Sequence, residues 1–230
     1  MQSHLEPVET GAPNRRGGEV QRIFRHIIAD ITEGVLRPGE KISEPELARA
    51  FGVSRGPLRE AIRRLEERQL VRCTPNFGAR VVSHTPREVL HAYEIREALE
   101  GLEARLAAAN MSDAEIRELR EVYVLEVSAA RSRGYLVDFH MQIVRGSHNQ
   151  RLIRMLNEDY YYLLKMWRSN CSWLRSGGEH SWTDHKRILE AIEYRDQDSA
   201  EMLMRRHVAR LRIESSRELE RLAIDLDAAA

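Results

Sequence analysis

The chain has 230 residues, and its 36 Lys and Arg side chains equal its 36 Asp and Glu side chains, so the formal net charge at pH 7 is zero. No apolar run approaches the length needed to cross a bilayer. The two cysteines, Cys73 and Cys171, are too few for a disulfide framework and indicate a reducing compartment. These features argue against a membrane-spanning or disulfide-rich secreted protein, and we expect a cytoplasmic one.

The chain divides into three parts. Residues 1–18 are polar, contain Gly and Pro, lack the apolar core of a secretory signal, and predict a disordered arm. Residues 19–83 carry 12 basic and 9 acidic side chains, a net charge of +3. Residues 84–230 carry 22 and 25, a net charge of −3. This mild asymmetry favours phosphate contacts in the first of these two domains without establishing them.

The first domain begins with three predicted helices. Residues 20–31 place apolar side chains at the helical spacing of three and four, and this helix ends near Gly34. Ser43 is the expected N-cap of a second helix, which ends at a tight turn at Gly52. Ser54 is expected to cap a third helix in the same way.

Two short strands follow, at residues 70–74 and 79–82, joined by the turn sequence Pro75-Asn76-Phe77-Gly78. Three helices followed by a hairpin form a winged helix-turn-helix. After residue 86 the chain predicts helices at 86–108, 112–133, 135–146, 149–174, 179–195 and 197–223. The predicted fold is therefore mainly α, with an N-terminal winged helix-turn-helix at 19–83 and a C-terminal antiparallel α-helical bundle at 84–230.

The third helix has two chemically different faces. Arg55, Arg59 and Arg63 recur every four residues and so lie along one face. Another face is apolar at Leu58, Ala61, Ile62 and Leu65. A helix anchored by apolar contacts, with arginines directed outward, suits the major groove of DNA, whereas the plainer alternative is an ordinary solvated helix face.

The sequence resembles the GntR-type transcription regulators, specifically the FadR-like branch. The similar residues in the first domain are Pro38-Gly39-Glu40-Lys41-Ile42-Ser43-Glu44, Leu47-Ala48, Gly52-Val53-Ser54-Arg55, Arg59-Glu60-Ala61-Ile62-Arg63-Arg64-Leu65 and Leu70-Val71. Further similar residues are Arg96, Glu100, Phe139-His140, Asn149, His185, Ile188, Ala191 and His207. The resemblance implies a homodimer on a palindromic operator, a small organic acid bound by the helical domain, and, as in many relatives, a divalent metal inside the bundle.

The family's recognition helix matches Ser54, Arg55, Gly56 and Arg59. We expect Arg55 and Arg59 to contact bases, because the guanidinium fork matches the two acceptors of guanine. Ser54 is expected to donate to a phosphate while capping the helix. Gly56 leaves room for close approach.

Other expected DNA contacts lie outside this helix. Gly78 would shape the wing, and Asn76 lies nearest its tip. Some relatives carry Arg where this chain has Pro45, which removes one base contact. Arg49 is the alternative contact to the DNA backbone.

Three histidines lie on apolar faces of three predicted helices. His140, His185 and His207 are therefore candidate ligands for zinc, nickel or a similar ion. The alternative is three hydrogen-bonded core histidines. The family adds an acidic ligand one turn before the first histidine, where this chain has Leu136, so weak or absent metal binding stays open.

Four residues are candidate contacts for the effector. By resemblance, Arg96 holds an effector carboxylate, and the alternative is an intrahelical pair with Glu100. Asn149 either points into the cavity or caps the next helix. Arg145 and Arg168 are further carboxylate candidates.

We therefore expect a regulator of transcription rather than an enzyme, a repressor released by a small carboxylate. One rival is a metal-dependent hydrolase, since three histidines can hold a metal that activates water. A second rival is a regulator whose metal is purely structural.

Overall fold

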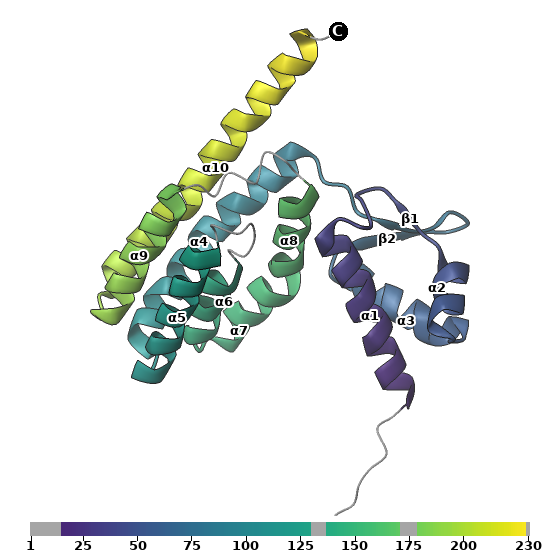
Figure 1. The fold of residues 1–230 in the computed structure, drawn as a ribbon, viewed down its shortest axis with the longest axis horizontal. Coiled ribbons are helices and arrows are strands. Elements are labelled where there is room, and N and C mark those ends of the chain that lie inside the picture. Colours follow the sequence, from purple (N-terminus) through teal and green to yellow (C-terminus); the bar gives the residue numbers. More distant parts are fainter. Residues whose placement is uncertain (1–14, 130–136, 171–178, 229–230) are drawn as a thin grey trace, which may run out of the picture. The chain divides into compact units, whose positions relative to one another are not determined.

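The computed structural model describes residues 15–129, 137–170 and 179–228, and it forms two compact units (Figure 1). The first contains the residues up to 31 together with 35–82, and the second contains 32–34 and 83–230. Within the described ranges, no helix combines the length and the apolar character needed to cross a membrane.

The first unit is a winged helix-turn-helix. Its elements are α1 (Arg15–Glu33), β1 (Lys41–Ile42), α2 (Glu44–Phe51), α3 (Arg55–Glu67), β2 (Val71–Thr74) and β3 (Gly78–Val81). The strands form an antiparallel sheet in the order β1-β3-β2, with Ile42 opposite Ala79 and Val71 opposite Val81. The sequence predicted only the hairpin, because the two residues of β1 are too short to show a strand period.

The core of the first unit confirms the predicted apolar faces. Leu58, Ala61, Ile62 and Leu65 of α3 are buried. The apolar side chains that define the period of α1 are buried as well: Val20, Ile23, Phe24, Ile27, Ile28 and Ile31. Ile42, Val71, Ala79 and Val81 close the core from the sheet. Burial of this face holds α3 in place and leaves its other face to solvent.

The helix ends of the first unit differ in part from expectation. Gly52 adopts the left-handed conformation (φ 63°) and ends α2, as predicted for the tight turn. Ser43 and Ser54 occupy N-cap positions, but neither side chain makes a capping hydrogen bond. For Ser54, Pro57 at the third helical position has no N–H, so one of the two possible capping partners is missing.

Helix α1 begins at Arg15, so residues 15–18, which we assigned to the arm, are helical. Arg15 and Arg16 favour this extension, whereas Gly17 and Gly18 disfavour it, so helix propensity alone does not explain it. Residues 1–14 of the predicted arm lie outside the described residues.

The second unit consists of helices. They are α4 (Pro86–Asn110), α5 (Asp113–Ala129), α6 (Val137–Gly146), α7 (Gln150–Arg154), the π-helix η2 (Met155–Tyr160), α8 (Tyr161–Asn170), α9 (Glu179–Glu193) and α10 (Gln197–Ala228). The long helix predicted at 149–174 is divided by η2, whose wider turn the periodicity does not reveal.

Helix α4 is the centre of this unit. It packs along α10 and also meets α6 and α9 (Figure 1). Gly101 faces α10, and a Cβ atom at this position would overlap the Arg205 side chain, which would have to move. Arg96, Glu100 and Glu103 on α4 are all buried, so this helix carries charged groups into the interior.

The start of α4 is fixed by a capping box. The Thr85 hydroxyl accepts from the Glu88 backbone N–H at 3.3 Å, and the Thr85 N–H donates to Glu88 Oε2 at 2.7 Å. The side chain of each residue thus bonds the backbone N–H of the other, at the first turn of α4.

We predict that Thr85→Ala lowers the free energy of unfolding of the helical unit by about 1 kcal/mol, because an N-cap side chain is lost. Urea unfolding followed by circular dichroism measures this change. Ser83→Ala is the matched control, since Ser83 is exposed and precedes the cap. Equal midpoints for the two variants would contradict the prediction.

Candidate functional site

The outward face of α3 presents the two arginines that we expect to read bases. Arg55 and Arg59 are exposed. Arg59 Nε lies 3.5 Å from Glu44 Oε2, in a pair that is open to solvent on the arginine side. Gly56 and Arg59 border a surface hollow of about 420 Å³. Such an exposed ion pair is weak and exchanges readily for another anion.

Arg63, the third arginine of the row, is already occupied. Its guanidinium pairs with Glu60 at 2.8 Å and also with Glu67. Arg63 and Arg64 hold the pKa of Glu60 below its usual range by hydrogen bonding, so that carboxylate stays charged. Arg63 thus differs from Arg55 and Arg59 in having two acidic partners on its own helix, in pairs that are also exposed to solvent.

Ser54 and Arg49 flank the recognition helix. Ser54 is exposed, and because its hydroxyl caps nothing it is available to a phosphate. Arg49 is exposed, and its Nε donates to the Pro45 carbonyl at 3.3 Å. The structure thus places both at the surface beside the face of Arg55 and Arg59.

The wing tip contains a residue that our sequence reasoning did not select. Asn76 (φ 66°) and Gly78 (φ 83°) take left-handed conformations and form the turn between β2 and β3. Phe77 between them is 68% exposed, and Lys41 from β1 lies beside Gly78. An aromatic residue inside a turn sequence is the signal that identifies Phe77.

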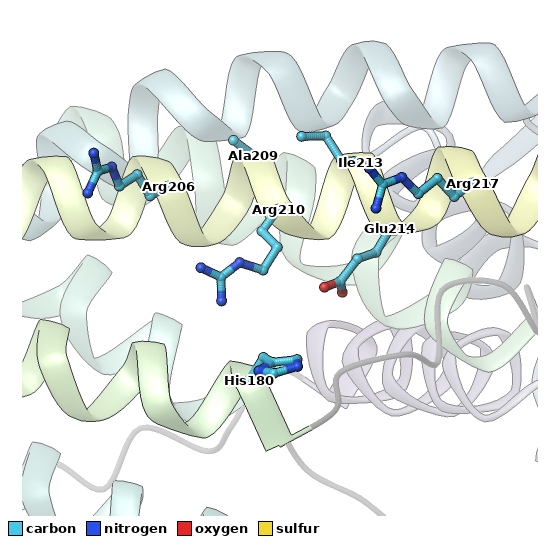
Figure 2. Close-up of a pocket in the computed structure, with 7 residues that line it drawn as sticks. All are labelled: His180, Arg206, Ala209, Arg210, Ile213, Glu214 and Arg217. Carbon is cyan, nitrogen blue, oxygen red and sulfur yellow. The ribbon is translucent and has the colours of Figure 1, made fainter.

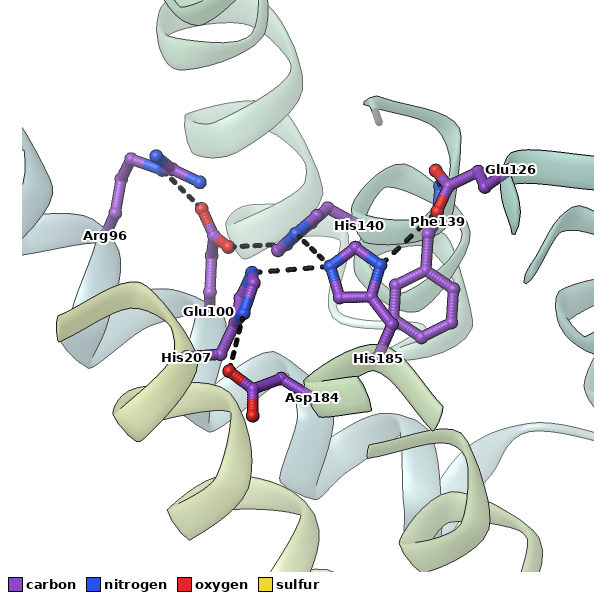
Figure 3. Close-up of polar contacts among 8 residues, drawn as sticks. All are labelled: Arg96, Glu100, Glu126, Phe139, His140, Asp184, His185 and His207. Atoms are coloured by element: carbon purple, nitrogen blue, oxygen red, sulfur yellow. Dashed lines mark hydrogen bonds and ion pairs between the residues drawn. The ribbon is translucent and has the colours of Figure 1, made fainter. Parts of the chain in front are cut away.

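In the second unit, the three histidines converge (Figure 3). His140 from α6, His185 from α9 and His207 from α10 are buried. The Nε2 atoms of His140 and His185 are 3.2 Å apart, and those of His185 and His207 are 3.3 Å apart. One possible ligand atom from each ring lies within 4.8 Å of the others.

Each ring is held from behind by a carboxylate. His140 Nδ1 lies 2.8 Å from Glu100, His185 Nδ1 lies 3.3 Å from Glu126, and His207 Nδ1 lies 3.4 Å from Asp184. A carboxylate accepts hydrogen bonds, so a proton on Nδ1 satisfies every pair. All three Nε2 lone pairs then face one another (Figure 3).

The protonation of this cluster follows from burial and charge. Burial lowers the pKa of His140 to about 4 and that of His207 to about 3, so both rings are neutral at pH 7. Burial opposes the ionisation of Glu100, but Arg96 and His140 hold the pKa of its carboxyl well below the usual range. Neutral imidazoles hydrogen-bonded to carboxylates are the form in which histidine binds metals.

The spacing of the nitrogens fits a metal ion. With a zinc–nitrogen bond of about 2.05 Å, the edge of a tetrahedral site measures about 3.3 Å. Two of the three Nε2 separations are 3.2 and 3.3 Å, and one ligand atom from each ring lies within 4.8 Å of the others. Three imidazoles leave at least one coordination position for water or an oxygen ligand. The donor set therefore suits zinc or nickel, and a cation would relieve the repulsion among the lone pairs.

Arg96 lies next to this cluster, linked to it through Glu100. Its Nε donates to Glu100 at 2.5 Å, and its guanidinium lies 4.6 Å from the ring centroid of Tyr93. The side chain is 1% exposed, yet Nη1 has no hydrogen-bond partner among the described residues. The intrahelical pair therefore exists, but it leaves part of the guanidinium fork unused.

Glu103 is a further buried acid that our sequence reasoning missed. Neither of its carboxyl oxygens has a partner among the described residues, and the side chain is fully buried. Burial, with the charge of Glu100 nearby, raises the pKa of Glu103 to about 9, so this group is neutral at pH 7. Its place on the inner face of α4, two turns after Arg96, is the signal that identifies it.

The remaining candidates lie elsewhere. Asn149 caps α7, accepting from the backbone N–H groups of Arg151 and Leu152, so the capping alternative is correct. Arg145 is exposed on α6, which makes it unsuited to a site inside the bundle. Leu136 and the side chain of Arg168 lie outside the described residues.

The hydrolase alternative loses its structural basis here. The three carboxylates beside the histidines, which the sequence did not reveal as partners, all engage Nδ1. They lie on the side of each ring opposite to the meeting point of the Nε2 atoms. None of these three acids is placed to move a proton at that point.

Comparison with known proteins agrees with both units. Residues 19–81 match the family of bacterial regulatory proteins, gntR family, and residues 91–210 match the FCD domain family. The chain is 31% identical to the Bacillus subtilis HTH-type transcriptional regulator YdhC, over 77% of this chain and 82% of the relative. It is 32% identical to the "Probable D-xylose utilization operon transcriptional repressor" of Paenarthrobacter nicotinovorans, over 80% and 82%.

The fold has known counterparts as well. A GntR transcriptional regulator from Rhodococcus sp. RHA1 aligns with a TM-score of 0.70 at 20% identity, over 86% of this chain and 97% of the other. McbR/YncC of E. coli aligns with a TM-score of 0.64 at 20% identity, over 92% and 99%. The relatives are transcription regulators rather than enzymes, as expected. The chain therefore belongs to the GntR family of bacterial regulatory proteins, with an FCD domain as its helical unit.

Proposed function

We propose that this regulator is a cytoplasmic homodimeric repressor that leaves its palindromic operator when the helical unit binds a small carboxylate. The observation that carries the effector part is Arg96 Nη1, a buried charged donor without a partner among the described residues. A buried unpaired guanidinium nitrogen is costly, and a ligand carboxylate would satisfy it.

The metal and the effector belong to one arrangement in this proposal. His140, His185 and His207 would hold a zinc or nickel ion, which would offer an open position to an oxygen ligand. Arg96 would orient the same ligand while Glu100 keeps both Arg96 and His140 in place. Because these residues come from four helices that pack against one another, a ligand that binds one arrangement of the helices better would shift the population of the unit.

In the DNA-binding part, Arg55 and Arg59 contact bases while Ser54, Arg49 and the wing contact the backbone. Support comes from their exposure on α3 and from the buried face that anchors this helix. Repression is supported by relatives whose names are those of repressors, among them RspR of Escherichia coli, 29% identical over 82% of this chain.

We predict that Arg59→Ala weakens specific DNA binding by about 1–3 kcal/mol and relaxes base preference at one position of each half-site, since one bidentate contact is lost. The assay uses a duplex selected from a random pool by the wild-type protein. Arg25→Ala, an exposed arginine of α1, is the control. Unchanged affinity in Arg59→Ala would contradict the docking of α3.

We predict roughly one tightly bound zinc or nickel ion per chain, and its loss in His185→Ala, because one of three ligands is removed. Elemental analysis after dialysis measures the ion. His180→Ala is the control, since His180 is an exposed histidine of the same helix. An ion-free wild-type protein would overturn the metal part of the proposal.

Metal removal distinguishes a metal that takes part in the response to the effector from a metal that is purely structural. We expect chelation to abolish the response of DNA binding to carboxylates while the helical content persists. Unfolding of the second unit on chelation, with no carboxylate altering DNA affinity, would support the structural alternative.

We predict that Arg96→Lys abolishes the release of DNA by carboxylates while DNA affinity without them is unchanged. Lysine retains the charge toward Glu100 but lacks the second arm of the guanidinium fork. A panel of small organic acids, tested for dissociation of the selected duplex, measures the response. Full release of the variant by the same acid would exclude Arg96 as the effector contact.

A further inference from the structure

A groove rich in basic side chains lies on the second unit, between the start of α9 and the middle of α10 (Figure 2). Its volume is about 770 Å³. It is lined by His180, Arg206, Ala209, Arg210, Ile213, Glu214 and Arg217. A space of this size accommodates a small molecule.

The arginines of the groove share one face of α10. Arg206, Arg210 and Arg217 are separated by four and seven residues, which places them in a row about 16 Å long. Ala209 and Ile213 lie between them and give the groove an apolar floor. Arg210 and Glu214 project from α10 toward the helix that carries His180 (Figure 2).

These arginines differ from their neighbours in how their charge is matched. Arg205 and Arg212 of the same helix pair with glutamates of α4. Arg206 and Arg217 make no ion pair within the described part of the chain. Glu214 in the lining offsets part of this charge, but with Arg210 matched by Asp184 the two unpaired arginines leave the groove net positive, which attracts anions.

Arg210 connects the groove to the histidine cluster. Its Nη1 lies 2.9 Å from Asp184 Oδ2, and the same oxygen lies 3.4 Å from His207 Nδ1. One oxygen of Asp184 thus contacts both Arg210 in the groove and His207 in the histidine cluster. The charge of Arg187 also acts on Asp184, so this carboxylate keeps a cationic neighbour if Arg210 turns away.

We propose that the groove is a second ligand site, which binds a small multivalent oxyanion, either a dicarboxylate or a phosphate compound. The unmatched arginines hold the negative groups, and the apolar floor contacts the carbon skeleton of a dicarboxylate. The anion competes with Asp184 for Arg210, which alters the hydrogen bond that orients His207. This site is separate from the proposed effector contact at Arg96.

The binding test uses glutarate, pyrophosphate and inorganic phosphate as probes, titrated calorimetrically into the full chain at chloride-matched ionic strength. We expect the Arg206→Gln/Arg217→Gln double variant to lose affinity by about tenfold or more. The control is Arg151→Gln/Arg154→Gln, which removes two exposed arginines of α7. Equal losses in both double variants, or no binding of any probe to the wild type, would overturn the proposal.

The same titrations distinguish the sources of the anion. Tighter binding of glutarate than of pyrophosphate assigns the groove to carboxylates, and the reverse assigns it to phosphates. A random-sequence duplex that displaces the probe at equal phosphate concentration would make DNA the occupant and overturn the small-anion proposal.

NMR of the His207 ring nitrogens tests whether binding in the groove affects His207. The saturating probe is expected to shift the His207 Nδ1 and Nε2 resonances in the wild type, and Arg210→Gln to show the shift without the probe. Bound probe with unchanged His207 resonances would overturn the connection. No duplex is needed, so a failure of the proposed repressor function would not affect this reading.

Discussion

The helical unit depends on three imidazole nitrogens that are made to face one another. Left alone, their lone pairs repel, and nothing in an apolar core favours this arrangement. Glu100, Glu126 and Asp184 make it possible, because each accepts a hydrogen bond from the Nδ1–H of one ring and so fixes the direction of that ring. The three acids come from α4, α5 and α9, so the geometry of the cluster is set by the packing of the whole bundle.

Two Arg–Glu pairs in this chain show how burial changes the role of the same chemistry. Arg59 and Glu44 are partly open to water, so their pair contributes little to stability and can be exchanged. Arg96 and Glu100 are enclosed, and removal of either would leave a charge without compensation. The first pair suits a surface that must accept a new partner, whereas the second suits a fixed interior.

Local periodicity was sufficient to predict most of this structure. The apolar rhythm of residues 20–31, the anchored face of α3 and the inward direction of His140, His185 and His207 all follow from helical spacing, and burial confirms them. Helical spacing predicted that each of these rings faces inward, but it did not predict the contacts between the three rings.

Contacts between elements could not be predicted in this way. Glu126 on α5 contacts His185 on α9, and Asp184 on α9 contacts His207 on α10. No spacing rule connects residues on different helices. The strand β1 was too short to leave a pattern, and no sequence period marks the wider turn of the π-helix at Met155–Tyr160. Pro57 at the third position of α3 leaves Ser54 without one of the two backbone N–H groups that an N-cap side chain can bond, which helical periodicity does not reveal.

Gly101 has a consequence for how this protein can evolve. His207 follows Arg205 by two residues on α10, and Arg205 lies where any side chain at position 101 would have to go. A larger residue there would have to displace the Arg205 side chain, on the same helix as His207, although no ligand had been replaced. Sequence drift at position 101 should therefore be accompanied by a shorter side chain at position 205, and the two positions should change together across descendants of this chain.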